Sequence, residues 1–298
     1  MNYPITLNGK TYVHGVTHNT KFHSDDVMCA ALLQVAVSII NDDLDATFPI
    51  MRCDAKTATE IYANNSNMLV FDIANSQYDH HLSPRETRPN GIPYAGFGKL
   101  WRDVGAELAF DEKHIEIFDR DFVQAIDLHD NEGVKNPMSI AIAAMNCDDL
   151  QDDARQYECF EYAVKWATTA LRSLISDLYL QQEAYVDIMH NGDQITRDND
   201  DITAVIYDHY IKSYWVQDVR PDHAMIYPHA RGGWSIQCLK TDRKQRILAP
   251  SVFRGKPFNE LREKVPGMRF CHASGFLMSF DTKEQAIDFF RRVRWYRP

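Results

Sequence analysis

Four groups of histidine and aspartate residues lie in the first 130 positions, each next to an expected end of a helix or strand. They are His18 and His23 with Asp25 and Asp26, then Asp72, then Asp79-His80-His81, and finally Asp127 with His129 and Asp130. Imidazole and carboxylate ligands together suit Mn²⁺, Fe²⁺ or Zn²⁺, whereas Mg²⁺ and Ca²⁺ prefer oxygen ligands alone. There are enough ligands for two ions about 3.5–4 Å apart, the arrangement that activates water against phosphate esters.

Each group also has a structural interpretation. A His-x-Asp segment after a strand often caps a helix, here with Ser24 or Asp25 accepting backbone N–H groups. A single aspartate such as Asp72 is common in loops. The presence of all four groups, each at an element boundary, favours a metal site over these separate interpretations.

The expected elements explain how distant groups could meet. Residues 12–17 and 67–74 have strand patterns, and residues 25–40 form an expected helix that is apolar on nearly every face. Further helices are expected at 96–104, 115–126 and 157–189. Strands alternating with helices predict a mainly parallel α/β sheet, in which ligands gather beyond the carboxyl ends of the strands.

A length of 298 residues favours two domains. We expect the metal site in a domain spanning 1–190, and the Asn- and Asp-rich segment 191–201 as a linker. Residues 202–298 then form a second, smaller α+β domain. Its expected elements are strands at 203–207, 224–227 and 235–239 and a helix at 283–293.

The composition is that of a soluble globular protein, with 45% hydrophobic and 25% charged residues. It excludes a disordered or collagen-like chain, and no apolar run reaches the roughly 20 residues that span a bilayer. The first ten residues resemble neither a signal peptide nor a transit peptide, so we expect a cytoplasmic protein without a membrane partner. No two of the six cysteines are close enough to form a zinc ribbon or redox pair.

Charge is unevenly distributed along the chain. From Lys212 onward there are 17 Lys and Arg against 8 Asp and Glu, and before it 15 against 34. This asymmetry favours cation binding in the first part and anion binding in the second, although solvated surface charge is the alternative. Candidate phosphate-binding residues lie in two glycine-containing turns, where backbone N–H groups can approach a ligand closely. They are Arg231, Gly232 and Gly233, with Trp234 as a base-stacking residue, and His272, Ser274 and Gly275.

The motifs together resemble a known superfamily. The segment 17–26, Asp72, Asp79-His80-His81 and the segment 127–131 resemble the DHH phosphoesterases, and within them the MYG-type exonuclease family of metal-dependent hydrolases. The segments 227–237 and 270–276 resemble the C-terminal signatures of that family. The resemblance extends from about residue 16 to residue 293.

The resemblance implies a metal-dependent 3′–5′ exonuclease that releases nucleoside 5′-monophosphates from RNA. Two divalent cations, which we expect to be Mn²⁺, would share Asp72 as a bridging and catalytic ligand. The other implied ligands are His18 and His23 for one cation, and Asp25, His80 and Asp127 for the other. His81 would face the phosphate as a hydrogen-bond donor or general acid. Whether His18 is a direct ligand stays open, and we prefer Asp127 to Asp130 because it is closer to the end of the preceding helix.

Three functions compete at this point. The first is exonuclease action on single-stranded or short RNA, or on DNA. The second is pyrophosphatase or cyclic-dinucleotide phosphodiesterase activity on the same metal site, and the third is a non-catalytic nucleotide-binding or metal-binding role. The acidic first part argues against wrapping long duplexes, whose affinity needs many phosphate contacts. The intact ligands in every group favour an enzyme, so exonuclease action on single-stranded or short RNA is our leading hypothesis.

Overall fold

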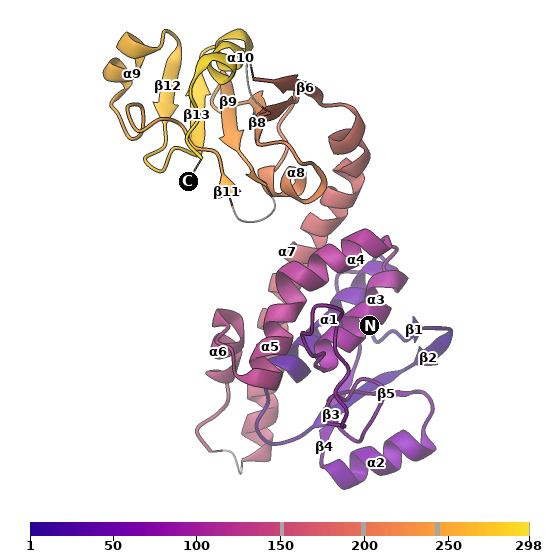
Figure 1. The fold of residues 1–298 in the computed structure, drawn as a ribbon. Coiled ribbons are helices and arrows are strands. Elements are labelled where there is room, and N and C mark those ends of the chain that lie inside the picture. Colours follow the sequence, from indigo (N-terminus) through magenta and orange to yellow (C-terminus); the bar gives the residue numbers. More distant parts are fainter. Residues whose placement is uncertain (150–151, 198–200, 242–244, 298) are drawn as a thin grey trace. The chain divides into compact units, whose positions relative to one another are not determined.

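The chain forms two compact units, Met1–Gln182 and Glu183–Pro298 (Figure 1). The computed structural model describes residues 1–149, 152–197, 201–241 and 245–297. In this described part, no helix combines the length and the apolar character needed to cross a membrane.

The first unit is built on a small parallel sheet with the strand order β4-β3-β5. Its strands are β3 (His14–His18), β4 (Ile50–Cys53) and β5 (Met68–Val70). They run parallel because a helix connects each to the next, α1 (Ser24–Ile40) and then α2 (Ala55–Asn64). A short antiparallel hairpin of β1 (Ile5–Leu7) and β2 (Lys10–Tyr12) precedes them.

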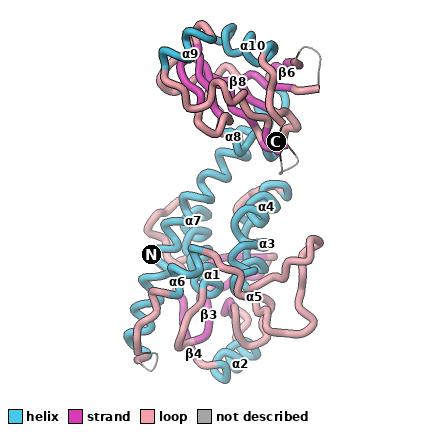
Figure 2. The backbone as a smooth tube through the Cα atoms, turned by 60° about the vertical axis from the view of Figure 1, so that its left-hand side comes forward, coloured by secondary structure: helices cyan, strands magenta, loops and turns pink. Residues whose placement is uncertain are grey.

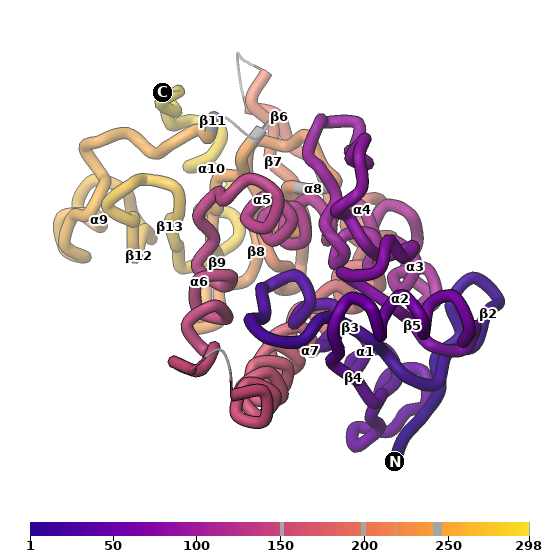
Figure 3. Tube along the Cα trace, turned by 90° about the horizontal axis from the view of Figure 1, so that it is seen from below, coloured from indigo at the N-terminus to yellow at the C-terminus, as the bar shows by residue number. Residues whose placement is uncertain are grey.

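Helix α1 is the centre of the first unit. Fourteen of its seventeen residues are buried, which confirms the predicted burial of the helix at 25–40. Helices α3, α5 and α6 contact α1, and α7 contributes to the same apolar core (Figures 2 and 3). The bounds of the later helices are α3 (Gly96–Glu107), α4 (Glu112–Phe118), α5 (Gln124–Glu132), α6 (Pro137–Ala143) and α7 (Asp153–His190). Helix α2 packs on the opposite face of the sheet, against Val16 and Val70.

One expected helix differs in detail. The segment predicted as a helix at 115–126 is α4, a π-helical turn at Asp119–Val123 and the start of α5. The π turn accommodates an extra residue within an otherwise continuous helical path, and such turns occur frequently at functional sites. Here the turn and α5 carry Asp119 and Asp127, which share one arginine partner described below.

The division between the units does not coincide with the expected linker. It falls between Gln182 and Glu183, inside the 38-residue helix α7. The segment 191–201, expected as a linker, includes strand β6 (Asp193–Thr196), and its residues 198–200 lie outside the described residues. A boundary inside a continuous helix has no Gly or Pro to mark it in the sequence, whereas the Asn- and Asp-rich segment imitates a linker.

The second unit contains a six-stranded mixed sheet with the order β12-β13-β9-β8-β7-β6. Only β7 and β8 run parallel. Besides β6, its strands are β7 (Thr203–Ile206), β8 (Ala224–Pro228), β9 (Trp234–Cys238), β12 (Met268–Cys271) and β13 (Leu277–Phe280). Strands β10 (Lys240–Thr241) and β11 (Gln245–Arg246) form a separate small ribbon.

Helices cover both faces of this larger sheet. Helices α9 (Phe258–Lys264) and α10 (Lys283–Arg292) share one apolar core with it, and α8 (Ser213–Val219) and the end of α7 share the other. The two units together confirm the predicted fold class, a helix-flanked parallel sheet followed by a smaller α+β region.

Candidate metal centre

Histidine and aspartate side chains from four segments converge at the carboxyl ends of β3 and β5. His18 ends β3 and Asp72 follows β5, and the two strands are parallel neighbours. Among the described residues, three overlapping groups have ligand atoms within 4.8 Å of one another. These groups are His18, His23 and Asp72, then Asp72, His80 and His81, and finally Asp25, His80 and Asp130.

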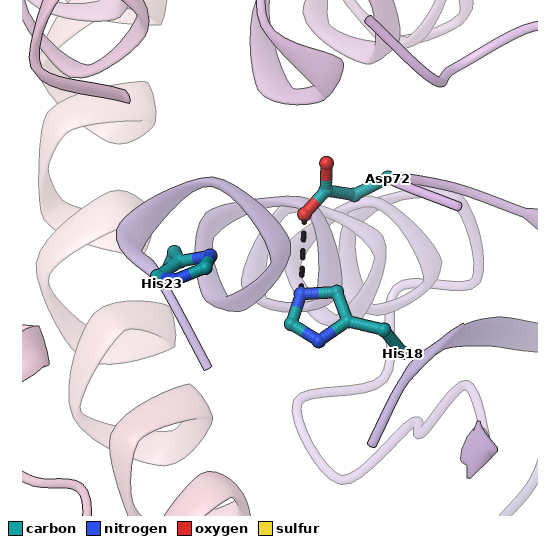
Figure 4. A group of neighbouring side chains, drawn as sticks. All are labelled: His18, His23 and Asp72. Atoms are coloured by element: carbon teal, nitrogen blue, oxygen red, sulfur yellow. Dashed lines mark ion pairs between the residues drawn. The ribbon is translucent and has the colours of Figure 1, made fainter. Parts of the chain in front are cut away.

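The first group contains His18, His23 and Asp72 (Figure 4). The Nε2 atom of His18 lies 3.3 Å from Oδ2 of Asp72 and 3.3 Å from Oδ2 of Asp26. The other ring nitrogen, Nδ1, is 3.0 Å from the carbonyl oxygen of Asn19 and can donate to it. This contact leaves the Nε2 lone pair directed at the carboxylates, which is the tautomer that a metal-binding histidine needs.

His80 is the second histidine that lies beside these carboxylates. Its Nε2 atom lies 3.2 Å from Oδ1 of Asp72, 3.1 Å from Oδ2 of Asp130 and 3.5 Å from Oδ2 of Asp25. Its Nδ1 atom is 3.2 Å from the side-chain oxygen of Asn131 and can donate to it. His80 therefore presents the same nitrogen as His18 to the shared carboxylate.

Asp72 connects the two histidines through different oxygen atoms. Oδ2 faces His18 and Oδ1 faces His80, as expected for a carboxylate that bridges two cations. The residue has a φ of 54°, in the left-handed region that L-residues rarely adopt. Its backbone N–H donates to the carbonyl of Tyr78 at 3.1 Å, which holds this turn in place. Strained backbone of this kind is concentrated at functional sites.

The chemistry of the donor set fits divalent cations. Oδ2 of Asp26, Oδ1 of Asp72 and Nε2 of His80 are buried and make no contact with hydrogen-bond geometry among the described residues, although they lie close to other polar atoms. Buried polar atoms without partners are rare in folded proteins and suggest an ion or water that completes them. Mixed imidazole and carboxylate ligands suit Mn²⁺, Fe²⁺ or Zn²⁺. Below, the metal group means the residues of the three overlapping groups, His18, His23, Asp25, Asp72, His80, His81 and Asp130.

The shifted pKa values in this group show that its buried carboxylates stabilise positive charge beside them. Burial lowers the pKa of His18, but the charges of Asp26 and Asp72 outweigh it and raise the value to about 9. Burial likewise opposes Asp130 and Asp72, which raise the pKa of His80 to about 11. Burial and repulsion from Asp72 raise the pKa of Asp25 well above its usual range. Cations bound here would supply the charge that protonated histidines supply otherwise.

Backbone N–H groups at the start of α3 orient Asp25. Its Oδ2 accepts from Gly96 at 3.0 Å and its Oδ1 from Phe97 at 2.7 Å. A Cβ atom at Gly96 would lie 2.7 Å from the carbonyl oxygen of Tyr78, so only glycine fits at this close approach. Sequence analysis could not identify this support, because it depends on a helix that begins 71 residues after the aspartate.

The structure does not bring Asp127 into the metal group. Its Oδ2 accepts from Nη2 of Arg88 at 2.6 Å, and its Oδ1 accepts from the backbone of Gly98 at 3.2 Å. Arg88 is itself buried and also binds Asp119 through two hydrogen bonds. Asp130, one turn further along α5, is the residue that lies against His80. Asp127 is thus paired with Arg88, and Asp130 is the aspartate of α5 that lies beside His80.

Asp79 holds His81 at the edge of the metal group. The ring Nδ1 of His81 is 2.7 Å from Oδ1 of Asp79, and this contact raises the pKa of His81. Asp79 is 3% exposed and also accepts backbone N–H groups from Asn75 and His81. The His81 side chain is 64% exposed, so its Nε2 is accessible to a substrate. A cavity of about 430 Å³ is lined by His18, His23, Asp72 and His81.

The two turns proposed for phosphate binding are far apart within the second unit. The turn with Arg231 joins β8 to β9, and the turn with His272 joins β12 to β13. In the sheet, Leu277 pairs with Gln237 and Phe280 pairs with Trp234. The turns therefore lie at opposite ends of the β9–β13 pair, separated by about 10 Å of strand.

Each turn has its own internal support. Gly232 and Gly233 have φ values of 79° and 81°, and Arg269 donates to the carbonyl of Gly232 at 2.6 Å. In the other turn, Nδ1 of His272 lies 2.7 Å from Oγ of Ser274, and Gly275 has a φ of 80°. The indole ring of Trp234 lies in β9 with the Lys283 ammonium 5.1 Å from its centre.

Comparisons with known proteins find one family match that covers nearly the whole chain. A protein-family model for MYG1 exonucleases, described as an uncharacterised protein family (UPF0160), matches residues 15–293. A protein of Mus musculus named MYG1 exonuclease is 24% identical over an alignment that covers 95% of this chain and 85% of that protein. No solved structure matches the chain.

Proposed function

The chain belongs to the MYG1 exonuclease family, and we propose that it is a metal-dependent phosphodiesterase that removes nucleotides from the 3′ end of single-stranded or short RNA. The observation that carries the proposal is Asp72, whose two oxygens face two different histidines in a buried group of acids. The polarity and the preference for RNA follow from the resemblance to the MYG-type exonuclease family, and the metal dependence follows from the donor set.

The residues divide into two ligand sets that share Asp72. His18 and His23 would complete the first set, and Asp25, His80 and Asp130 would complete the second. Two divalent cations, with Mn²⁺ as our choice, would activate water and neutralise the charge on the phosphate. Asp26 accepts the His23 backbone N–H at 2.8 Å, which fixes the start of α1 beside the first set.

His81 is our candidate for the proton donor. Hydrolysis breaks the bond between phosphorus and the 3′ oxygen of the preceding nucleotide while water adds to phosphorus, and that oxygen needs a proton. Asp79 fixes one ring nitrogen of His81 and stabilises the protonated ring. The exposed Nε2–H can then donate to the leaving oxygen, or to a phosphate oxygen as the charge develops.

A direct test follows the products formed from 5′-labelled RNA oligomers. With Mn²⁺ we expect a descending ladder of labelled fragments and release of nucleoside 5′-monophosphates, and a chelator should abolish both. Pyrophosphate and cyclic dinucleotides should be hydrolysed poorly in parallel reactions. A labelled mononucleotide as the first product would contradict the polarity, and hydrolysis that persists in excess chelator would contradict the metal dependence.

The turns of the second unit give a separate prediction. We propose that Arg231 and His272, with the neighbouring Gly232, Gly233, Trp234, Ser274 and Gly275, contact substrate phosphates or bases. Replacing Arg231 or His272 with Ala should each raise the KM for short RNA by about tenfold, the effect of losing a hydrogen bond to a charged group. The turns lie at opposite ends of the β9–β13 strand pair. The losses of binding free energy in the two single variants should therefore add within about 0.5 kcal/mol in the double variant. A double variant no worse than either single variant would contradict this arrangement.

A further inference from the structure

A second cavity adjoins the metal group, with a volume of about 380 Å³. Its wall includes His80 and Asp130 from the metal group and reaches Ser139 in α6. Lys21 and Arg85 also line it, from the loop before α1 and the loop after β5. A part of the substrate next to the reacting phosphate could therefore occupy this cavity.

The two positively charged side chains that line this cavity, Lys21 and Arg85, have no anionic partner among the described residues. Lys21 and Arg85 are exposed, and no hydrogen bond or ion pair joins either side chain to another described residue. Arg88, three residues after Arg85, is the opposite case, because it is buried and bound to Asp119 and Asp127. Lys21 and Arg85 are thus available to an anion that enters the cavity, whereas Arg88 is not.

Two hydroxyl groups in the same wall point to a bound ligand independently of the charge. Ser24 and Ser139 are 2% and 0% exposed, and neither Oγ atom has a hydrogen-bond partner among the described residues. Both residues line the cavity. Buried hydroxyls normally have partners, so these two are available to an acceptor group of a ligand. Hydroxyl donors beside cations are typical contacts for a phosphate group.

We propose that this cavity is a subsite for a second substrate phosphate, the one next to the phosphate that is hydrolysed. The inference rests on the proposed function and narrows its substrate class. The last phosphodiester joins the 3′-terminal nucleotide to the penultimate nucleotide. The next phosphate along the chain is attached to the 5′ oxygen of that penultimate nucleotide. The preferred small substrate is therefore a dinucleotide that carries a 5′-phosphate, rather than an isolated phosphodiester.

The test compares three substrates with the Mn²⁺-loaded protein: bis(p-nitrophenyl) phosphate, a dinucleotide with a 5′-hydroxyl and the same dinucleotide with a 5′-phosphate. We expect kcat/KM to be about tenfold or more higher for the 5′-phosphorylated dinucleotide than for the 5′-hydroxyl form. The Arg85→Ala variant should bring this ratio close to one, mainly through KM, while the bound metal per chain stays at the wild-type value. Arg85→Lys should restore part of the ratio, because the charge remains but the planar fork is lost.

A matched control is Lys165→Ala, since Lys165 lines a different cavity of about 590 Å³ in the same unit. This variant should keep the wild-type ratio. Equal kcat/KM for both dinucleotides in the wild type would overturn the subsite and leave the proposed function standing. A high ratio that survives Arg85→Ala would overturn the assignment to this cavity. Failure of the wild type to hydrolyse any of the three substrates would overturn the subsite, and failure on RNA oligomers as well would overturn the proposed function.

Discussion

Replacing Asp72 with Asn should lower phosphodiester hydrolysis by about a thousandfold or more while the protein stays folded. In the proposed site, Asp72 would be shared by both ligand sets, so its loss would weaken both cation sites at once, and metal catalysis supplies several kcal/mol of transition-state stabilisation. Asparagine keeps the size of the side chain and tolerates the left-handed backbone that the structure shows at this position. The measurement is kcat/KM with Mn²⁺, together with the metal content of the purified variant.

Asp103→Asn provides a matched control for this substitution. Asp103 is also a largely buried carboxylate of the first unit, and it accepts a hydrogen bond from the Tyr78 hydroxyl at 2.8 Å. It lies outside the metal group, so its variant should keep nearly the parental activity. An Asp72→Asn protein that hydrolyses RNA at close to the parental rate would show that the metal group is misassigned.

The two aspartates of α5 should respond to substitution in opposite ways. Asp127→Asn removes a charge partner of the buried Arg88, a change worth about 3 kcal/mol and hence about 6–12 °C in melting temperature. Asp130→Asn should lower the melting temperature of the metal-free protein less, because His80 keeps Asp25 and Asp72 as charge partners when residue 130 is neutral. It should instead lower activity by about a hundredfold or more through weaker metal binding.

Two measurements separate these outcomes: thermal unfolding in chelator, and metal bound per folded chain. Asp127→Asn should bind metal normally once folded, at a temperature well below its transition. If Asp127→Asn loses metal without losing stability, and Asp130→Asn does the reverse, Asp127 is the ligand and the assignment must be exchanged.

The sequence was sufficient for the fold class because its signals are local. The apolar run ending at Phe71 and the all-round apolar helix at 25–40 directly reflect a covered parallel sheet. Strand β4, with only four residues, and the hairpin β1–β2 escaped the sequence analysis because short elements carry too little periodicity to be recognised. The unit boundary escaped it because composition cannot reveal a division inside a helix.

For the candidate site, spacing identified which segments meet but not which side chain of a segment faces inward. Asp127 and Asp130 are three residues apart on one helix, so both could face the same direction. The choice depends on Arg88, whose guanidinium binds Asp127 from a loop 39 residues earlier. The support of Asp25 by the backbone of Gly96 and Phe97, and the separation of the two turns in the second unit, are likewise tertiary properties.

Asp25, Asp26 and Asp72 are buried close together in the proposed metal site. Substitutions in such a crowded group of acids can increase the stability of the fold and at the same time remove the proposed activity. Burial raises the pKa of Asp25 and of Asp26, so without a cation each of these two acids costs the folded state free energy. Asp72 differs, because His18 and His80 hold its pKa below the usual range. Neutral side chains at positions 25 and 26 would therefore strengthen the fold while removing the proposed activity, and a duplicated gene released from selection for hydrolysis should change first at these two positions. The proteins encoded by such genes would be more stable and keep the same fold. Retention of these aspartates in a lineage would indicate that hydrolysis is still under selection.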